Sequence, residues 1–114
     1  MVVEDDDDTR EALSDLLREH DYDVVAVENG RDALAQLRAT PRVQAIVVDV
    51  EMPVMNGATF RGEQLSDPEL ASIPLVLLTG RDDIKALSMA LSAAACLRKP
   101  IVGDALIRVL DRYR

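Results

Sequence analysis

Short apolar runs alternate along the chain with stretches in which apolar residues recur three and four positions apart. The short runs are typical of β-strands, and the wider spacing is typical of amphipathic α-helices. Five strands are predicted, at 1–3, 24–27, 45–48, 75–78 and 95–97. Helices are predicted around 12–17, 31–38, 58–65, 84–91 and 106–113. Strict alternation of five strands with five helices predicts an α/β fold, a parallel sheet with helices on both faces.

Local signals agree with these boundaries. Asp8 followed by Glu11 predicts an N-cap and a capping box for the first helix. Asn29 and Gly30 predict a turn ahead of the second helix. The third and fourth apolar runs show no polar alternation, as expected for strands that are covered on both faces.

Composition narrows the class of protein. The 114 residues fit one domain, 1–114, and hold no apolar run long enough to cross a membrane. The formal net charge of −8 disfavours nucleic acid as a direct partner, because phosphate contacts need clustered cations. The one cysteine, Cys96, excludes an internal disulfide framework. We therefore expect a compact, acidic, cytoplasmic module without a membrane partner.

Polar residues follow four of the predicted strands at their carboxyl ends. Glu4 and Asp5 follow the first strand, Asp49 the third, Thr79 the fourth and Lys99 the fifth. Because the carboxyl ends of parallel strands meet at one edge of a sheet, these side chains are expected to converge. Clustered carboxylates repel one another unless a proton or a divalent cation binds, and oxygen-only ligands favour Mg²⁺.

The same side chains fit phosphoryl transfer. A carboxylate beside a metal ion can attack phosphorus and form an acyl phosphate. The oxygens of that product need positive charge, which Mg²⁺ and a lysine supply, and a threonine hydroxyl donates a hydrogen bond. Asp49, Thr79 and Lys99 fit the three protein roles.

Four segments carry a resemblance to a known family, and it covers essentially all 114 residues. They are 2–6, 47–57, 77–80 and 97–100. In the order and spacing of these segments the chain resembles the bacterial response-regulator receiver domain. The resemblance implies a flavodoxin-like, doubly wound (βα)5 fold and a phosphoacceptor switch of a two-component phosphorelay. It implies no enzyme activity beyond Mg²⁺-dependent self-phosphorylation and autodephosphorylation.

The resemblance also implies roles for the acidic residues. Asp49 is expected to accept a phosphoryl group from a histidine kinase or a histidine phosphotransfer protein. Asp5 and Asp49 are expected to hold Mg²⁺ through their side chains. Glu4 is expected to contact the ion through a water, and Glu51 through its backbone carbonyl.

A further set of residues is implied to carry the switch. Thr79 is expected to contact the phosphoryl group and move inward, and Lys99 is expected to pair with the phosphoryl group. The resulting change of surface is expected to be recognised by a downstream effector. The Lys99–Pro100 peptide is expected to be cis. Cys96 stands where relatives usually have tyrosine, phenylalanine or histidine, whose ring turns inward with the threonine. Ring-coupled switching therefore cannot operate here in the usual way, and we expect Cys96 to be a small buried hydrophobe.

Glu51 and Arg81 lie two residues after Asp49 and Thr79, at positions that tune the phosphoryl lifetime in relatives. Their opposite charges are expected to pair over the site and hinder attacking water, giving a long-lived phosphoryl group. Ser92 replaces a customary glycine.

Other interpretations of the chain stay open. One is a pseudo-receiver that binds a partner without being phosphorylated. Another is a Mg²⁺-dependent nuclease or topoisomerase-type domain, which the net charge of −8 disfavours. A phosphatase with an aspartate nucleophile would need a second aspartate where Glu51 stands. The sequence leaves open whether the chain is a stand-alone regulator or part of a hybrid kinase. Four arginines are predicted on solvated faces: Arg10, Arg18, Arg38 and Arg42.

Overall fold

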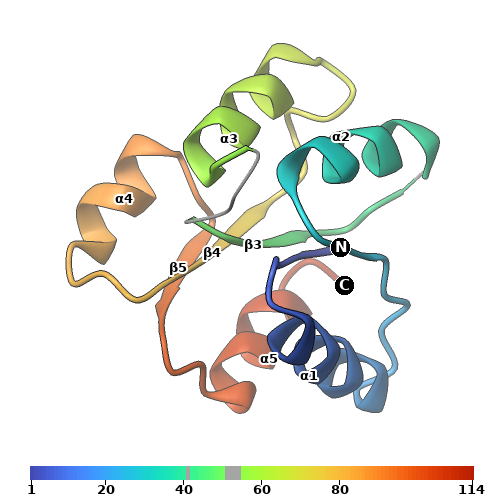
Figure 1. Cartoon of the computed structure of the whole chain (residues 1–114), viewed down its shortest axis with the longest axis vertical. Helices are drawn as coiled ribbons and strands as arrows, with labels where there is room; N and C mark the ends of the chain where they lie inside the picture. The colour runs from blue at the N-terminus through green and yellow to red at the C-terminus, as the bar shows by residue number, and fades with distance from the viewer. Residues whose placement is uncertain (41, 51–54) are drawn as a thin grey trace.

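A parallel sheet of five strands, counted over the described residues 1–40, 42–50 and 55–114, organises the chain in this computed structural model (Figure 1). The strand order is β2-β1-β3-β4-β5. The strands are β1 Val2–Val3, β2 Ala26–Val27, β3 Ile46–Asp49, β4 Leu75–Thr79 and β5 Ala95–Arg98. The helices are α1 Asp7–Glu19, α2 Gly30–Ala39, α3 Gly57–Ser66, α4 Ile84–Ala90 and α5 Gly103–Asp111. The predicted α/β fold with a flavodoxin-like parallel sheet is confirmed.

Helices cover both faces of the sheet and enclose an apolar core on each side (Figure 1). α1 and α5 lie on one face, and α2, α3 and α4 lie on the other. Successive strand residues point to opposite faces, so Val47 joins the core with α1 and α5 while Val48 joins the other. This two-sided burial explains the continuous apolar runs. In the described part of the chain, no helix combines the length and apolar character that crossing a membrane requires.

The strand order brings the carboxyl ends of β1 and β3 together. Val3 of β1 lies opposite Val27 of β2 on one side and Val48 of β3 on the other. The strand that follows β1 in the chain, β2, lies on one side of β1, and the remaining strands lie on the other side. The direction in which the chain adds strands therefore reverses at β1. In open α/β sheets, ligands bind at such a reversal, outside the carboxyl ends of the strands.

Each of the five strands differs from its predicted range by one or two residues at one or both ends. The predicted strand 24–27 is a strand only at Ala26–Val27, because only these two residues pair with the two-residue strand β1. The third strand begins one residue later than predicted and includes Asp49. Asp49 lies opposite Leu78 of β4, so the sheet itself holds the backbone that carries this carboxylate.

The N-cap of α1 is Asp6, so the prediction of Asp8 as N-cap with Glu11 was wrong. The Asp6 carboxylate accepts hydrogen bonds from the backbone N–H of Thr9 (2.8 Å) and from its hydroxyl (2.6 Å). Asp6 is favoured as the cap because Thr9, three residues later, supplies both of these donors to its carboxylate. The helix therefore begins at Asp7, closer to the end of β1.

Gly57 sits at a close approach of α3 to the chain after β3. A Cβ atom at this position would lie 2.9 Å from Val50 Cα. Gly57→Ala is therefore expected to lower the free energy of unfolding by about 1–3 kcal/mol. Gly62 of the same helix is the matched control, because a Cβ there meets nothing within 4 Å. Gly62→Ala is expected to be neutral or to stabilise by up to about 1 kcal/mol, and a denaturant titration that ranks the two variants the other way would contradict this packing.

Candidate functional site

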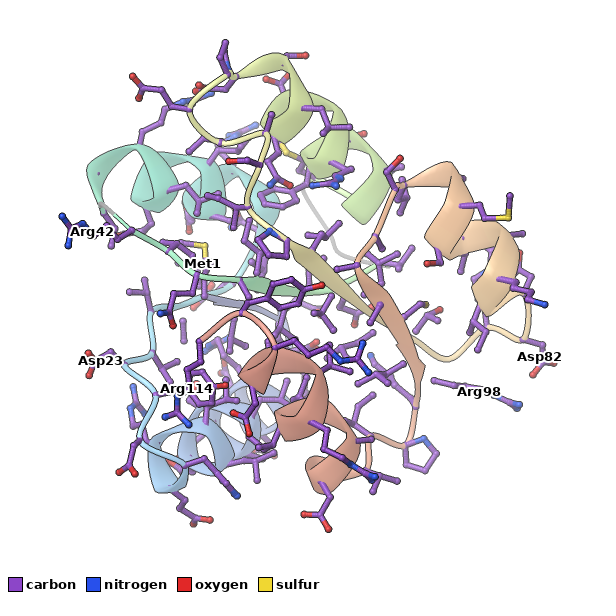
Figure 2. All side chains as sticks on the ribbon, turned by 180° about the vertical axis from the view of Figure 1, so that it is seen from behind. Met1, Asp23, Arg42, Asp82, Arg98 and Arg114 are labelled. Carbon is purple, nitrogen blue, oxygen red and sulfur yellow. The ribbon has the colours of Figure 1, made fainter. Side chains whose placement is uncertain are left out.

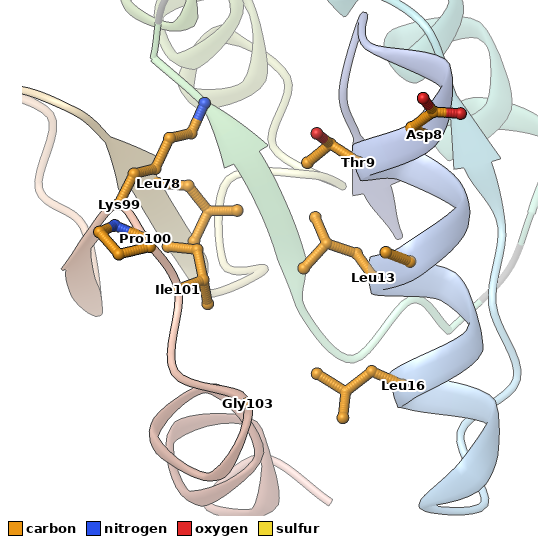
Figure 3. A pocket seen from close by; sticks show the side chains of 10 residues that line it. Asp8, Thr9, Leu13, Leu16, Leu78, Lys99, Pro100, Ile101 and Gly103 are labelled. Carbon is orange, nitrogen blue, oxygen red and sulfur yellow. The ribbon is translucent and has the colours of Figure 1, made fainter.

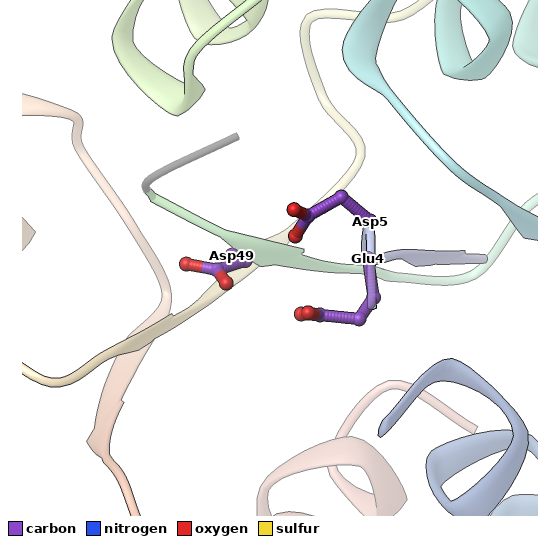
Figure 4. Close-up of side chains that lie close together, drawn as sticks. All are labelled: Glu4, Asp5 and Asp49. Carbon is purple, nitrogen blue, oxygen red and sulfur yellow. The ribbon is translucent and has the colours of Figure 1, made fainter. Parts of the chain in front are cut away.

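Three carboxylates meet at the carboxyl ends of β1 and β3 (Figure 4). Glu4 and Asp5 directly follow β1, and Asp49 is the last residue of β3. One carboxylate oxygen from each of the three lies within 4.8 Å of the others. Glu4 and Asp49 are 2% and 5% exposed, whereas Asp5 is exposed to solvent. The predicted convergence of these side chains is thus observed.

The donor set fits a hard divalent cation. Glu4 Oε2 is buried and has no hydrogen-bond partner among the described residues, while Oε1 accepts a 3.3 Å hydrogen bond from the backbone N–H of Asp6. A buried carboxylate oxygen without a donor is costly unless a cation or a proton neutralises it. Oxygen ligands at this spacing suit Mg²⁺ with waters completing its shell. Glu51, predicted to add a backbone carbonyl, lies outside the described residues.

Lys99 supplies positive charge to the cluster. It follows β5, where its backbone N–H donates to the Thr79 carbonyl at 2.7 Å. Its Nζ lies 2.7 Å from Asp49 Oδ2. Burial by itself would lower the pKa of Lys99, but its hydrogen bond and ion pair with Asp49 and the charges of Glu4 and Asp5 outweigh this and raise it. Lys99 is therefore cationic beside Asp49, and the predicted cis Lys99–Pro100 peptide is present.

Thr79 lies at the end of β4, next to β3 in the sheet, and is fully buried. Its Oγ1 accepts a 3.1 Å hydrogen bond from the backbone N–H of Arg81. A threonine hydroxyl can accept and donate at once, so this bond leaves its hydrogen for donation. The order of the sheet thus brings Thr79 and Lys99 to the same edge as the three carboxylates.

The surroundings of Glu4 change its acidity. Burial, followed by the negative charge of Asp49, raises the pKa of Glu4 from 4.5 to about 7. Near neutral pH this carboxyl therefore holds a proton part of the time when no cation is present. A divalent cation and this proton would compete for the same oxygens.

The raised pKa of Glu4 is expected to make stability depend on pH. Between 4.5 and about 7 the folded chain binds more protons at Glu4 than the unfolded chain does. Without divalent cations, the free energy of unfolding should therefore fall as pH rises through this window, by the order of 1–3 kcal/mol. Glu4→Gln should flatten the fall, as measured by denaturant unfolding across a pH series. Identical pH profiles for the wild type and the variant would count against this assignment.

Arg81 binds a partner on its own loop. Its Nε and Nη2 donate to the two carboxylate oxygens of Asp83 at 3.0 and 2.7 Å. Both side chains are about half exposed, so this pair contributes little to stability. The predicted contact of Arg81 with Glu51 involves a residue outside the described ranges, and it stays a prediction.

Cys96 lies in β5, opposite Leu77 of β4, and packs against the core under α2, α3 and α4. Burial, followed by the charge of Asp83, raises the pKa of the Cys96 thiol. The thiol therefore stays protonated at neutral pH, and a protonated thiol is a poor nucleophile. Cys96 is half-buried rather than fully buried, and its expected role as a small buried hydrophobe stays a prediction.

Sequence reasoning missed the inward orientation of Arg10. Its side chain is only 18% exposed and contacts the end of β1, whereas a solvated face was predicted. The spacing of Asp7 and Arg10, three residues apart on a helix, was a signal for the ion pair between them. No local signal pointed to the contact with β1. Arg98 of β5 and Asp82 form an exposed ion pair of 2.8 Å (Figure 2).

A groove borders Lys99 on the side of α1 (Figure 3). It lies between α1 and the segment from Lys99 to Gly103, and its volume is about 530 Å³. Apolar side chains form most of its lining, among them Leu13, Leu16, Leu78 and Ile101. The groove therefore offers an apolar surface directly beside the polar cluster.

Comparison with known proteins agrees with this geometry. The two-component response regulator ORR7 of Oryza sativa subsp. japonica is 32% identical over 98% of this chain and 54% of its own length. The signal receiver domain of a signal transduction histidine kinase from Syntrophus aciditrophicus has a TM-score of 0.88 and 32% identity, over 98% of this chain and 86% of that one. The receiver domain of the sensor histidine kinase PA1611 from Pseudomonas aeruginosa PAO1 shares the fold, with a TM-score of 0.88 and 24% identity over 98% of this chain and 93% of that one. That structure is described with a magnesium ion coordinated in its active site cleft.

The family is shown by the match of nearly the whole chain to one family model. Residues 1–111 match the response regulator receiver domain. The chain spans about half the length of the curated relatives that it matches first. Receiver domains are generally switches rather than conventional enzymes. With its five-stranded parallel sheet and its acidic cluster beside Lys99, the chain belongs to the response regulator receiver domain family.

Proposed function

We propose that this chain is the phosphoacceptor switch of a two-component phosphorelay and that Asp49 accepts the phosphoryl group. The contact that carries the proposal is the 2.7 Å ion pair between Lys99 and Asp49, beside the carboxylates of Glu4 and Asp5. Asp49 is buried at the end of a central strand, which fixes its direction, and it is flanked by groups that can neutralise added charge.

The transfer step follows from the positions of these groups. An Asp49 carboxylate oxygen attacks the phosphorus of a phosphohistidine, forming an O–P bond as the P–N bond breaks. The bonding electron pair leaves with the ring nitrogen. A phosphohistidine protonated on its other ring nitrogen leaves as neutral imidazole, and an unprotonated one takes a proton from solvent as it leaves. Lys99 Nζ, already 2.7 Å from Asp49 Oδ2, shifts to a phosphoryl oxygen. The Thr79 hydroxyl donates to another, because its hydrogen is left for donation.

Glu4, Asp5 and Asp49 would hold Mg²⁺, together with the backbone carbonyl of Glu51. The bound ion supplies positive charge where the phosphoryl oxygens crowd against carboxylates. The chain's own part is to hold three carboxylates together, at a cost in burial and in repulsion that raises the pKa of Glu4. Lys99 offsets part of this repulsion.

The phosphodonor in this proposal is a histidine kinase or a histidine phosphotransfer protein. The apolar groove between α1 and the segment before α5 adjoins Lys99 and offers such a protein a surface beside the acceptor (Figure 3). A downstream effector would read the surface that changes when Thr79 moves. A nuclease or topoisomerase-type function would leave Thr79 and Lys99 without roles. The net charge of −8 also disfavours binding to the negatively charged DNA backbone.

The test is the intact mass of the wild-type protein after incubation with acetyl phosphate. With Mg²⁺ present, a single acid-stable, base-labile phosphoryl increment is expected. With EDTA in place of Mg²⁺ the increment should disappear, because the carboxylates then repel the anionic donor. An absent increment in a protein that still binds Mg²⁺ would overturn the proposal and favour a pseudo-receiver.

A further inference from the structure

Arg10 holds together the loops beside the acidic cluster. It lies in the first turns of α1, and its Nη1 donates to the backbone carbonyl of Glu4 at 3.0 Å. Its Nη2 pairs with Asp7 Oδ1 and lies 3.8 Å from Glu28 Oε1. Both carboxylate partners are largely exposed, at 81% and 68%, while the Arg10 side chain is 18% exposed. The Arg10 side chain is therefore largely shielded from solvent, unlike its two carboxylate partners.

These contacts fix the peptide that joins Glu4 to Asp5. The C=O of this peptide, which belongs to Glu4, accepts from Arg10 at 3.0 Å. The preceding peptide is held as well, because the N–H of Glu4 donates to the Val27 carbonyl of β2 at 3.0 Å. A peptide group is planar, so holding its carbonyl oxygen also sets the direction in which the next residue leaves. The carboxylates of Glu4 and Asp5 flank this one peptide. One carboxylate oxygen of each lies within 4.8 Å of an Asp49 oxygen.

We propose that Arg10 is a positioning residue for Mg²⁺, an inference that rests on the proposed function. It would hold the Glu4–Asp5 peptide in the orientation that binds the ion, without touching the ion itself. Groups that orient metal ligands are often worth a factor of about 10–100 in affinity. A guanidinium also carries positive charge, which by itself would repel a cation. The two effects have opposite signs, so experiment can separate them.

The test is the Mg²⁺ affinity of Arg10→Ala, measured by calorimetric titration of the folded protein. Positioning predicts a dissociation constant about tenfold weaker than that of the wild type. Charge repulsion predicts an unchanged or tighter constant. Arg18→Ala is the matched control, because it removes the same charge from the same helix and Arg18 is 56% exposed, with a 3.8 Å contact to Asp15. The control should change the affinity by less than about twofold.

A second readout excludes a general structural defect. At saturating Mg²⁺, the Arg10→Ala variant should reach the wild-type extent of Asp49 phosphorylation, with only its half-saturating Mg²⁺ concentration raised. Arg10→Lys keeps the charge, but a single ammonium cannot bridge the Glu4 carbonyl, Asp7 and Glu28 at once. The Mg²⁺ affinity of this variant should therefore also fall. A wild-type affinity in either Arg10 variant would overturn the positioning role alone. Failure of the wild type to bind Mg²⁺ would overturn the proposed function, and this inference with it.

Discussion

Asp49→Asn is expected to abolish the phosphoryl mass increment completely. An amide is a poor nucleophile at phosphorus, and the variant cannot form the acyl phosphate. The fold should survive, because Asn preserves the shape of the side chain and removes one of three clustered negative charges. Without Mg²⁺ we expect the variant to be as stable as the wild type or more so. Intact-mass measurement after treatment with acetyl phosphate and Mg²⁺ checks the first expectation, and denaturant unfolding checks the second.

Asp23→Asn is the control for this substitution. Asp23 is exposed and lies on the stretch between α1 and β2 (Figure 2). The Asp23→Asn variant loses the same charge by the same chemical change. This variant protein should nevertheless be phosphorylated to the same extent as the wild type. An undiminished increment in Asp49→Asn would place the acceptor on another residue and contradict the assignment.

Arg61→Met is expected to lower the free energy of unfolding by about 3 kcal/mol. Arg61 of α3 is 6% exposed. Its guanidinium donates to the carbonyls of Leu91 and Ser92, both at 2.8 Å, and to Gln64 Oε1 at 2.7 Å. Methionine would leave these three acceptors without that donor. Burial lowers the pKa of Arg61, which shows that the buried charge has its own cost. The lost hydrogen bonds should outweigh the relief of this burial cost, because the two backbone carbonyls stay in place and need a donor.

Chemical denaturation of Arg61→Met and Arg38→Met measures this difference. Arg38 is the control, because it is about half exposed and pairs with Asp67 at 3.5 Å. Its substitution should change stability by less than about 0.5 kcal/mol. A loss below about 1 kcal/mol in Arg61→Met would show that the carbonyls find other donors.

The Arg61 contacts also concern the attachment of α4. No residue of Ile84–Ala90 is fully buried, and Asp83 at the N-cap makes no side-chain capping bond. Arg61 binds the carbonyls at the other end of this helix, where Ser92 has a φ of 50°. A non-glycine residue in this left-handed region is strained, and Arg61 helps to hold it there. Faster hydrogen exchange of α4 amides should therefore accompany the loss of stability in Arg61→Met.

The order of elements and the chemistry of the strand ends could be predicted from the sequence. Continuous apolar runs such as 75–78 are typical of strands that are buried on both faces. The segments between these runs have helical periodicity, and strict alternation of strands and helices allows few topologies. Asp49, Thr79 and Lys99 followed from that topology, because parallel strands bring their carboxyl ends to one edge. These conclusions needed only periodicity and position along the chain.

The sequence determined less where several equivalent residues compete. The acidic run 5–8 offers four aspartates, and propensity alone cannot choose among them as the helix cap. The structure selects Asp6, because Thr9 gives it two donors. In the same way Arg10, Arg38 and Arg61 are chemically alike, yet their surroundings differ completely.

The sequence by itself determined the sheet, its helical layers and the residues at the strand ends. Only the tertiary structure decided which arginines turn inward and which carbonyls they bind. Arg61 reaches carbonyls 30 and 31 residues away, and Arg10 joins the end of β1 to Glu28 after β2. Periodicity is a local property that every helix or strand repeats, whereas these contacts depend on how distant segments pack. The energy of a buried polar group is set by that packing, so it cannot be predicted from local spacing.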